Sequence, residues 1–73
     1  MEKQTFTAVI HKEEDMYVAE CPEIGVISQG KTVEEAIANL KEATELYLEE
    51  FPIKKEEKPF MTIFEVKQHA QVA

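Results

Sequence analysis

The chain has 73 residues, which leaves room for one small domain and excludes separate catalytic and recognition domains. Apolar residues make up 44% of it and charged residues 32%, a globular composition rather than a disordered or fibrous one. Folding at this length buries only about 60% of the surface that the open chain exposes. We therefore expect a single domain over residues 1–73, with a thin core and with help from a partner subunit.

The charge is strongly negative: 8 Lys, no Arg and 15 acids give a formal net charge of −7. Nucleic-acid binders normally carry a basic patch with Arg side chains for phosphate and guanine, so this composition argues against direct binding of nucleic acid or of an anionic membrane. A basic partner is the better electrostatic match. No apolar run reaches the roughly 20 residues that a membrane-spanning helix needs.

Cysteine usage and the first residues indicate the compartment. Cys21 is the single cysteine and has no partner for an internal disulfide. The segment Met1–Thr5 lacks the apolar stretch of a signal peptide. We expect the protein to be cytoplasmic.

Three short strands are predicted in the first half of the chain. Alternating apolar and polar residues predict the first strand over Thr5–Lys12. After a polar turn, Met16–Cys21 has the pattern of a second strand, which Pro22 ends. The β-branched segment Gly25–Gly30 is bounded by glycines and completes an antiparallel meander. The apolar side of the first strand consists of Phe6, Ala8 and Ile10.

A helix is predicted next, because Thr32 and Glu35 have the spacing of a capping box. In such a box the Thr32 hydroxyl bonds the Glu35 amide, and the Glu35 carboxylate reaches back to the Thr32 amide. Pro52 ends the helix near Phe51. At about 100° per residue, the apolar side chains fall on one arc of about 140°, which should cover the sheet. These residues are Val33, Ala36, Ile37, Leu40, Ala43, Thr44, Tyr47, Leu48 and Phe51.

The last third of the chain predicts a charged connector over Lys54–Pro59, a fourth strand over Phe60–Val66 and a frayed tail over 68–73. The order is β-β-β-α-β. It indicates an α+β fold: a three-stranded antiparallel meander plus a fourth strand, with one amphipathic helix packed on one face. A right-handed crossover most simply places the fourth strand parallel to a meander strand.

Three stretches together resemble the HicB-like antitoxin family of small prokaryotic toxin–antitoxin systems. They are Asp-Met-Tyr-Val-Ala-Glu-Cys-Pro-Glu at 15–23, Ser-Gln-Gly-Lys-Thr at 28–32, and Glu-Glu-Ala-Ile-Ala-Asn-Leu-Lys-Glu-Ala at 34–43. No single stretch is specific, because a capping box is common. Their order and spacing carry the resemblance, which spans about Phe6 to Glu50.

The resemblance implies a truncated ribonuclease H-like fold and an antitoxin that masks HicA, a small basic RNA-cleaving toxin. The chain departs from the family pattern in three places. Met16 stands where the hairpin usually has glycine, and Glu23-Ile24-Gly25 is shorter than the usual leucine-proline-glycine turn. The sequence also stops at Ala73, before the DNA-binding segment that many members carry. We therefore expect no direct contact with nucleic acid, and a stand-alone homo-oligomeric regulatory or structural domain without a toxin is the alternative.

Nuclease activity is not expected, because it needs a cluster of carboxylates that holds two divalent metals. Asp15 is the single aspartate. Glu20 and Glu65 lie in predicted strands, where glutamates are usually solvated.

The remaining reactive side chains also lack a signature. His11 and His69 have no metal-ligand spacing. Cys21 and His11 could meet across the hairpin as nucleophile and base, but small cysteines are common in strands for packing alone. The sequence thus predicts no enzyme, no cofactor and no metal.

The outer face of the predicted helix carries four glutamates between about 100° and 180° on the helical wheel, opposite the apolar arc. We call this set the acidic ridge: Glu34, Glu42, Glu45 and Glu49. Such charge usually only keeps a helix solvated. The alternative is a docking strip for a basic partner. Glu49 favours docking, because negative charge at a helix C-terminus is unfavourable by a few tenths of a kcal/mol.

Two further features complete the predicted partner-binding surface. Leu46 falls near 220° on the wheel and should be exposed, although a lone surface leucine is ordinary. The sheet face without a helix, where Thr7, Val9 and His11 or their counterparts lie with Tyr17, is a candidate for self-association. The predicted partner-binding residues are Glu34, Glu42, Glu45, Leu46, Glu49 and Tyr17.

Overall fold

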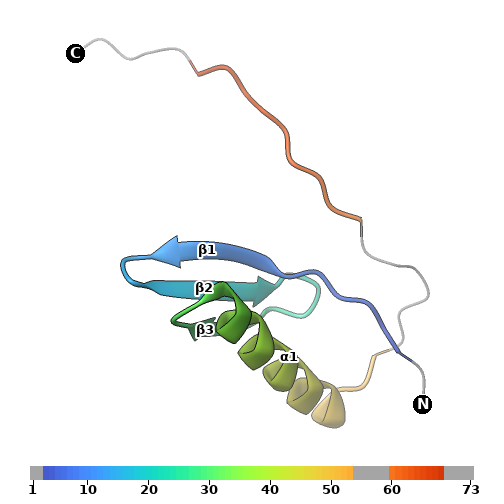
Figure 1. The fold of residues 1–73 in the computed structure, drawn as a ribbon. Helices are drawn as coiled ribbons and strands as arrows, with labels where there is room; N and C mark the ends of the chain where they lie inside the picture. The colour runs from blue at the N-terminus through green and yellow to red at the C-terminus, as the bar shows by residue number, and fades with distance from the viewer. Residues whose placement is uncertain (1–2, 54–59, 69–73) are drawn as a thin grey trace.

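The computed structural model describes residues 3–53 and 60–68. Within them the elements are β1 (Val9–Glu13), β2 (Met16–Cys21), β3 (Val26–Gly30) and α1 (Val33–Glu50). The strands form one antiparallel sheet in the order β1-β2-β3, and α1 packs on one of its faces (Figure 1). The α+β architecture, the meander and the single amphipathic helix are therefore confirmed.

A tight turn sets the register of the sheet. Glu13 pairs with Met16, so the turn consists of Glu14 and Asp15 alone. Glu14 has a φ of 55°, the left-handed conformation that glycine adopts without strain and that such hairpin turns require. The register then pairs Ile10 with Ala19. It also pairs Ala19 with Ser28, so these three residues share the face toward α1.

The core lies between this face and α1, and it is thin. Among the residues that the structure describes, four apolar side chains are buried, namely Ala19, Cys21, Ala36 and Leu40. Around them pack partly buried side chains: Phe6, Ala8, Ile10, Tyr17, Ile24 and Val26. Half of the buried set is alanine, so each strand must approach the helix closely to exclude water.

Gly30 makes the closest of these approaches. A Cβ at this position would lie 2.6 Å from the Ala36 backbone nitrogen, a distance that only glycine avoids. The first turn of α1 starts just beyond it, at the N-cap residue Thr32. Thr32 Oγ1 accepts from the Glu35 amide at 3.0 Å, as the capping box predicts. The prediction for the Glu35 carboxylate was wrong: it accepts from the amide of Lys31, one residue before the N-cap, and not from the Thr32 amide.

The helix sits off-centre on the sheet, over β3 and to a lesser degree β2. Asn39 Nδ2 donates to the Gln29 carbonyl oxygen at 2.8 Å and fixes one side of α1 to the β3 edge. Ile37 lies on the other side of the buried stripe of α1, about 160° away by helical geometry. It points toward the β1 side and is 41% exposed. The β1 edge is therefore the less covered edge of the sheet.

The first strand is shorter than predicted. The ladder begins at Val9, which pairs with Glu20, and not at Thr5. The register would place Thr7 opposite Pro22, which has no amide hydrogen and lies in the turn after β2. Thr7 instead donates from its amide to the Glu23 carboxylate at 3.1 Å.

The fourth strand, predicted over Phe60–Val66, is not confirmed. Residues 60–68 have no regular secondary structure and run apart from the sheet and the helix (Figure 1). Phe60 and Phe64 are 92% and 82% exposed. Aromatic and β-branched residues supply strand propensity here, but a strand exists only through pairing with a neighbour. The predicted connector Lys54–Pro59 and, except for Gln68, the predicted tail lie outside the described residues.

Candidate binding surfaces

The acidic ridge is formed as the helical wheel predicts. Glu34, Glu42, Glu45 and Glu49 are all exposed on α1. The helix contains six glutamates and one lysine. In the part of the chain that the structure describes, none of the four ridge carboxylates forms an ion pair. The ridge is thus a solvated anionic strip.

The C-terminal end of the ridge is electrostatically unfavourable for the helix alone. The last turn of α1 contains Glu49 and Glu50 and no basic residue. Negative charge there opposes the partial negative charge of the helix C-terminus. Leu46 lies beside this end and is 57% exposed, as predicted. A partner that carries a cation and an apolar side chain could therefore contact Glu49 and Leu46 on one face of the helix.

Tyr17 does not lie on the sheet face without a helix, where the sequence predicts it. Lys12 pairs with Tyr17, and His11 pairs with Val18. Tyr17 therefore shares a face with Ala19 and packs against the core, while His11 lies on the opposite face. The Lys12 Nζ lies 5.8 Å from the centroid of the Tyr17 ring. The expected cluster of Tyr17 with Val9 and His11 is not formed.

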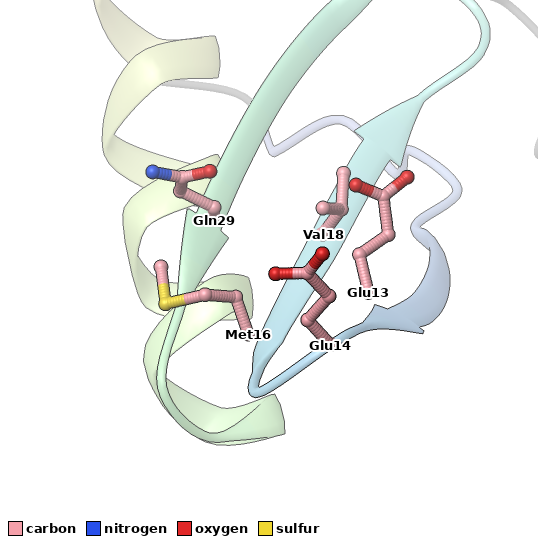
Figure 2. A pocket seen from close by; sticks show the side chains of 5 residues that line it. All are labelled: Glu13, Glu14, Met16, Val18 and Gln29. Atoms are coloured by element: carbon pink, nitrogen blue, oxygen red, sulfur yellow. The ribbon is translucent and has the colours of Figure 1, made fainter.

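The sheet face away from α1 has a hollow of about 540 Å³ beside the β1–β2 turn. Figure 2 shows two carboxylates there, from Glu13 and Glu14, together with apolar side chains from β2. Glu13 Oε2 also lies 3.0 Å from His11 Nε2. The lining residues are Glu13, Glu14, Met16, Val18 and Gln29. The sequence pattern does not predict this second acidic surface, although a two-residue turn implies that Glu13 and Met16 meet.

Glu23 is a further residue that the pattern of the sequence does not reveal. Its carboxylate accepts from the Thr7 hydroxyl at 2.8 Å and from the Cys21 thiol at 3.4 Å. Partial burial acts to raise the pKa of Glu23, but the hydrogen bonds from Thr7, from the Glu23 amide and from the Cys21 thiol together outweigh it, and the net pKa lies below the ordinary value. Burial, and then the neighbouring Glu23, raise the pKa of Cys21. The contacts join the residues before β1 to the turn after β2.

The positions of Cys21 and His11 exclude one of the catalytic arrangements considered from the sequence. Cys21 faces α1 and His11 faces away from it, so they lie on opposite faces of the sheet and cannot act as nucleophile and base. No group of three or more His, Cys, Asp or Glu side chains within residues 3–53 and 60–68 is arranged to hold a metal ion. His69 lies outside these ranges. In the same ranges, no helix has the length and apolar character needed to cross a membrane.

Comparison with known proteins identifies the family. The family model described as "HicB_like antitoxin of bacterial toxin-antitoxin system" matches residues 6–72. A UPF0150 protein of Thermoplasma acidophilum is 39% identical over 67 residues, which cover 89% of this chain and 97% of the relative. A UPF0150 protein of Synechocystis is 40% identical over 55 residues, covering 73% and 80%. No solved structure matches.

A UPF0150 protein of Helicobacter pylori is 57% identical over 42 residues, covering 56% of this chain and 58% of the relative. The match thus spans little more than half the length of that relative. The family model, in contrast, covers nearly the whole sequence, from the residues before β1 to the end of the segment after the helix. Together with the meander, the capped helix and the acidic ridge, the match shows that the chain belongs to the HicB-like antitoxin family of bacterial toxin–antitoxin systems.

Proposed function

We propose that this protein is a cytoplasmic antitoxin that binds a small basic RNA-cleaving toxin of the HicA type and masks it, acting by binding and not by catalysis. The observation that carries the proposal is the acidic ridge, a row of exposed carboxylates without ion pairs in the described structure. From Glu34 to Glu49 the ridge runs about 22 Å along α1. This length suits the face of a small basic domain.

The ridge supplies steering and orientation more than raw affinity. A strip of one charge sign raises the association rate with an oppositely charged partner. Each exposed ion pair contributes only about 0.2–1 kcal/mol, so tight binding needs an apolar anchor as well. Leu46 is a suitable anchor, because it is exposed and lies beside Glu42 and Glu49. A partner cation near Glu49 also relieves the repulsion at the helix C-terminus.

We also propose that the domain, over residues 1–73, is a truncated ribonuclease H-like fold in which Phe60–Val66 adds the fourth strand once an edge receives it. The meander followed by a covering helix supports this interpretation, as does the family membership. We expect no direct binding of nucleic acid, because the ridge and the hollow are both anionic and would repel phosphate.

Charge reversal on the ridge tests the toxin interface. The chain is co-expressed with the small basic protein encoded beside it, and growth and complex recovery are measured. We expect Glu42→Lys, Glu45→Lys and Glu49→Lys together to abolish the complex and the relief of growth arrest. The matched control changes Glu13, Glu14 and Asp15 to Lys, which alters the net charge equally but at the β1–β2 turn.

The outcomes separate the two acidic surfaces. Loss of the complex only with the ridge variant supports the proposal. Equal loss with both variants means that net charge, and not the ridge, governs binding. If the unaltered chain neither binds the basic protein nor relieves the arrest, the proposed function is wrong.

The alternative is a stand-alone homo-oligomeric regulatory or structural domain without a toxin. The observation that favours it is the exposure of the apolar side chains between Phe60 and Val66, which are costly to leave in water. Light scattering at micromolar concentration tests it. A molar mass of 8.4 kDa, that of one chain, would count against this alternative.

A further inference from the structure

The segment Phe60–Val66 exposes an unusual amount of apolar surface for a small domain. Phe60, Ile63 and Phe64 are 92%, 89% and 82% exposed, and Met61 and Val66 are exposed as well. The segment is rich in aromatic and β-branched residues, which favour strands, and in an extended strand Phe60, Phe64 and Val66 would share one side. An apolar strand left in water is a template for pairing with another chain.

The sheet offers one suitable edge. β1 has a neighbour on one side only, and α1 leans away from it toward β3. On the helix-facing side of β1, Ile10 is only half-buried, and Ile37 of α1 is 41% exposed above the same side of the sheet. A strand added beside β1 would place its inward side chains below Ile37 and against Ile10. The β3 edge is different, because Asn39 of α1 already bonds the Gln29 carbonyl there.

We infer that Phe60–Val66 of one copy pairs with the β1 edge of a second copy, and that the second copy returns the same contact. Each chain has one donor strand and one open edge, so a two-fold dimer satisfies both at once. The exchanged strand completes a four-stranded sheet in each half. The proposal concerns the chain by itself and does not rest on the presence of a toxin.

A second copy, and not the chain's own edge, is favoured by the path after the helix. The Gln4 side-chain amide donates to the Ile53 carbonyl oxygen at 3.0 Å, so the chain leaves the helix beside the residues that lead into its own β1. Even so, residues 60–68 do not turn back along that edge, and they run away from it (Figure 1). The single chain therefore presents the strand and the edge apart from each other.

The area is sufficient for a stable dimer. A phenylalanine side chain buries about 150–250 Å², so reciprocal exchange of Phe60 and Phe64 buries on the order of 600–1,000 Å² in total. The three other apolar side chains of the segment and the surface lost by β1 add to this. The interface thus reaches the roughly 1,200–2,000 Å² of specific, stable complexes.

Two measurements on the full chain test the proposal. Light scattering at about 100 μM should give twice 8.4 kDa, the mass of one chain. Isotope-filtered NMR on an equal mixture of labelled and unlabelled chains should show contacts between the Phe64 ring and the Ile10 methyl groups of different copies. A monomer overturns the proposal, and so does a dimer in which these contacts are within one chain or missing.

A matched pair of variants locates the interface. Phe64→Lys should weaken the dimer by at least about 10-fold, because it places an unpaired charge in an apolar contact. Ile27→Lys, on β3 and away from the β1 edge, should leave the dimer unchanged. Both positions are exposed in the single chain, so both variants should keep the far-ultraviolet circular dichroism of the folded domain. An unchanged dimer for Phe64→Lys overturns the proposal.

Discussion

The two edges of the sheet differ in how completely one chain finishes them. At β3, the helix covers the strand, Gly30 lets the backbone of α1 approach, and Asn39 bonds the edge carbonyl of Gln29. At β1, the helix-facing Ile10 is half-buried, Lys12 is exposed, and no strand within residues 3–53 and 60–68 lies outside. Contacts between neighbouring elements of one chain therefore cover the β3 side. The β1 side can be covered only by a segment from far along the chain or from a second copy.

The largest expected effect is on the covered side. Leu40 is 5% exposed, so Leu40→Ala should lower the free energy of unfolding by about 2–4 kcal/mol, enough to leave so small a domain largely unfolded. Ile37→Ala, on the side toward β1, should cost less than about 1 kcal/mol in dilute solution, because that side chain is partly exposed. Urea unfolding of both variants makes the comparison. Equal losses would show that the two sides are packed alike.

A somewhat smaller effect is expected at the helix–β3 contact. In Gly30→Ala the new methyl group would lie 2.6 Å from the Ala36 nitrogen, so the helix must shift at a cost of about 1–3 kcal/mol. Gly25→Ala is the control, since no atom lies within 4 Å of its Cβ position and only the positive φ of 76° opposes the change. We expect about 1 kcal/mol for this control. A smaller loss for Gly30→Ala than for Gly25→Ala would contradict the close approach.

The stability that the contacts between Thr7 and Glu23 contribute, just before β1, should depend on pH. The folded pKa of Glu23 is lowered, so its contribution is present above the unfolded pKa of about 4.3 and is lost as pH falls through the folded pKa. Glu23→Gln should therefore cost about 0.5–1 kcal/mol at pH 7, and this difference should shrink below about pH 4. Thermal unfolding of both chains from pH 7 to pH 3 measures it. A difference that stays constant across this range would mean that the Thr7 contacts do not depend on the carboxylate charge.

The smallest effect is expected in the β1–β2 turn, and it is stabilising. Glu14 has a φ of 55°, which glycine adopts without strain. Glu14→Gly should raise the stability by about 0.5–1 kcal/mol. Asp15→Gly serves as the control, because its backbone conformation does not call for glycine and the change should be neutral or destabilising. The denaturant midpoint should rise for Glu14→Gly and should stay unchanged or fall for Asp15→Gly.

Features set by neighbouring residues could be predicted from the sequence. The bounds of β2 follow from a segment that lies between a polar turn and Pro22, and the start of α1 follows from the cap at Thr32. The acidic ridge and the exposed Leu46 follow from helical periodicity alone. These predictions hold because each depends on contacts within one turn or one strand.

Features that depend on register or on partners could not be predicted in the same way. The face of Tyr17 depends on the length of the β1–β2 turn, and one residue more would move it to the other face. The link from Thr7 to Glu23 joins residues 16 apart and leaves no periodic pattern. The fourth strand needs an edge to pair with, which propensity does not provide.

The acidic ridge and the β1 edge lie on different parts of the molecule. The ridge is on the face of α1 that points away from the sheet, whereas β1 borders the sheet itself. A basic toxin on the ridge and a second copy at β1 would therefore not compete. The two proposals are independent, and each can fail without the other.

Amide hydrogen exchange at two protein concentrations tests the difference between the edges most directly. We predict that the β3 amides are equally protected from exchange at about 1 μM and at about 200 μM, because α1 of the same chain covers them. Residues of β1 and of Phe60–Val66 should gain protection only at the higher concentration. Two results would contradict the exchange of strands between copies: protection of Phe60–Val66 that is the same at both concentrations, or no protection of this segment at either concentration.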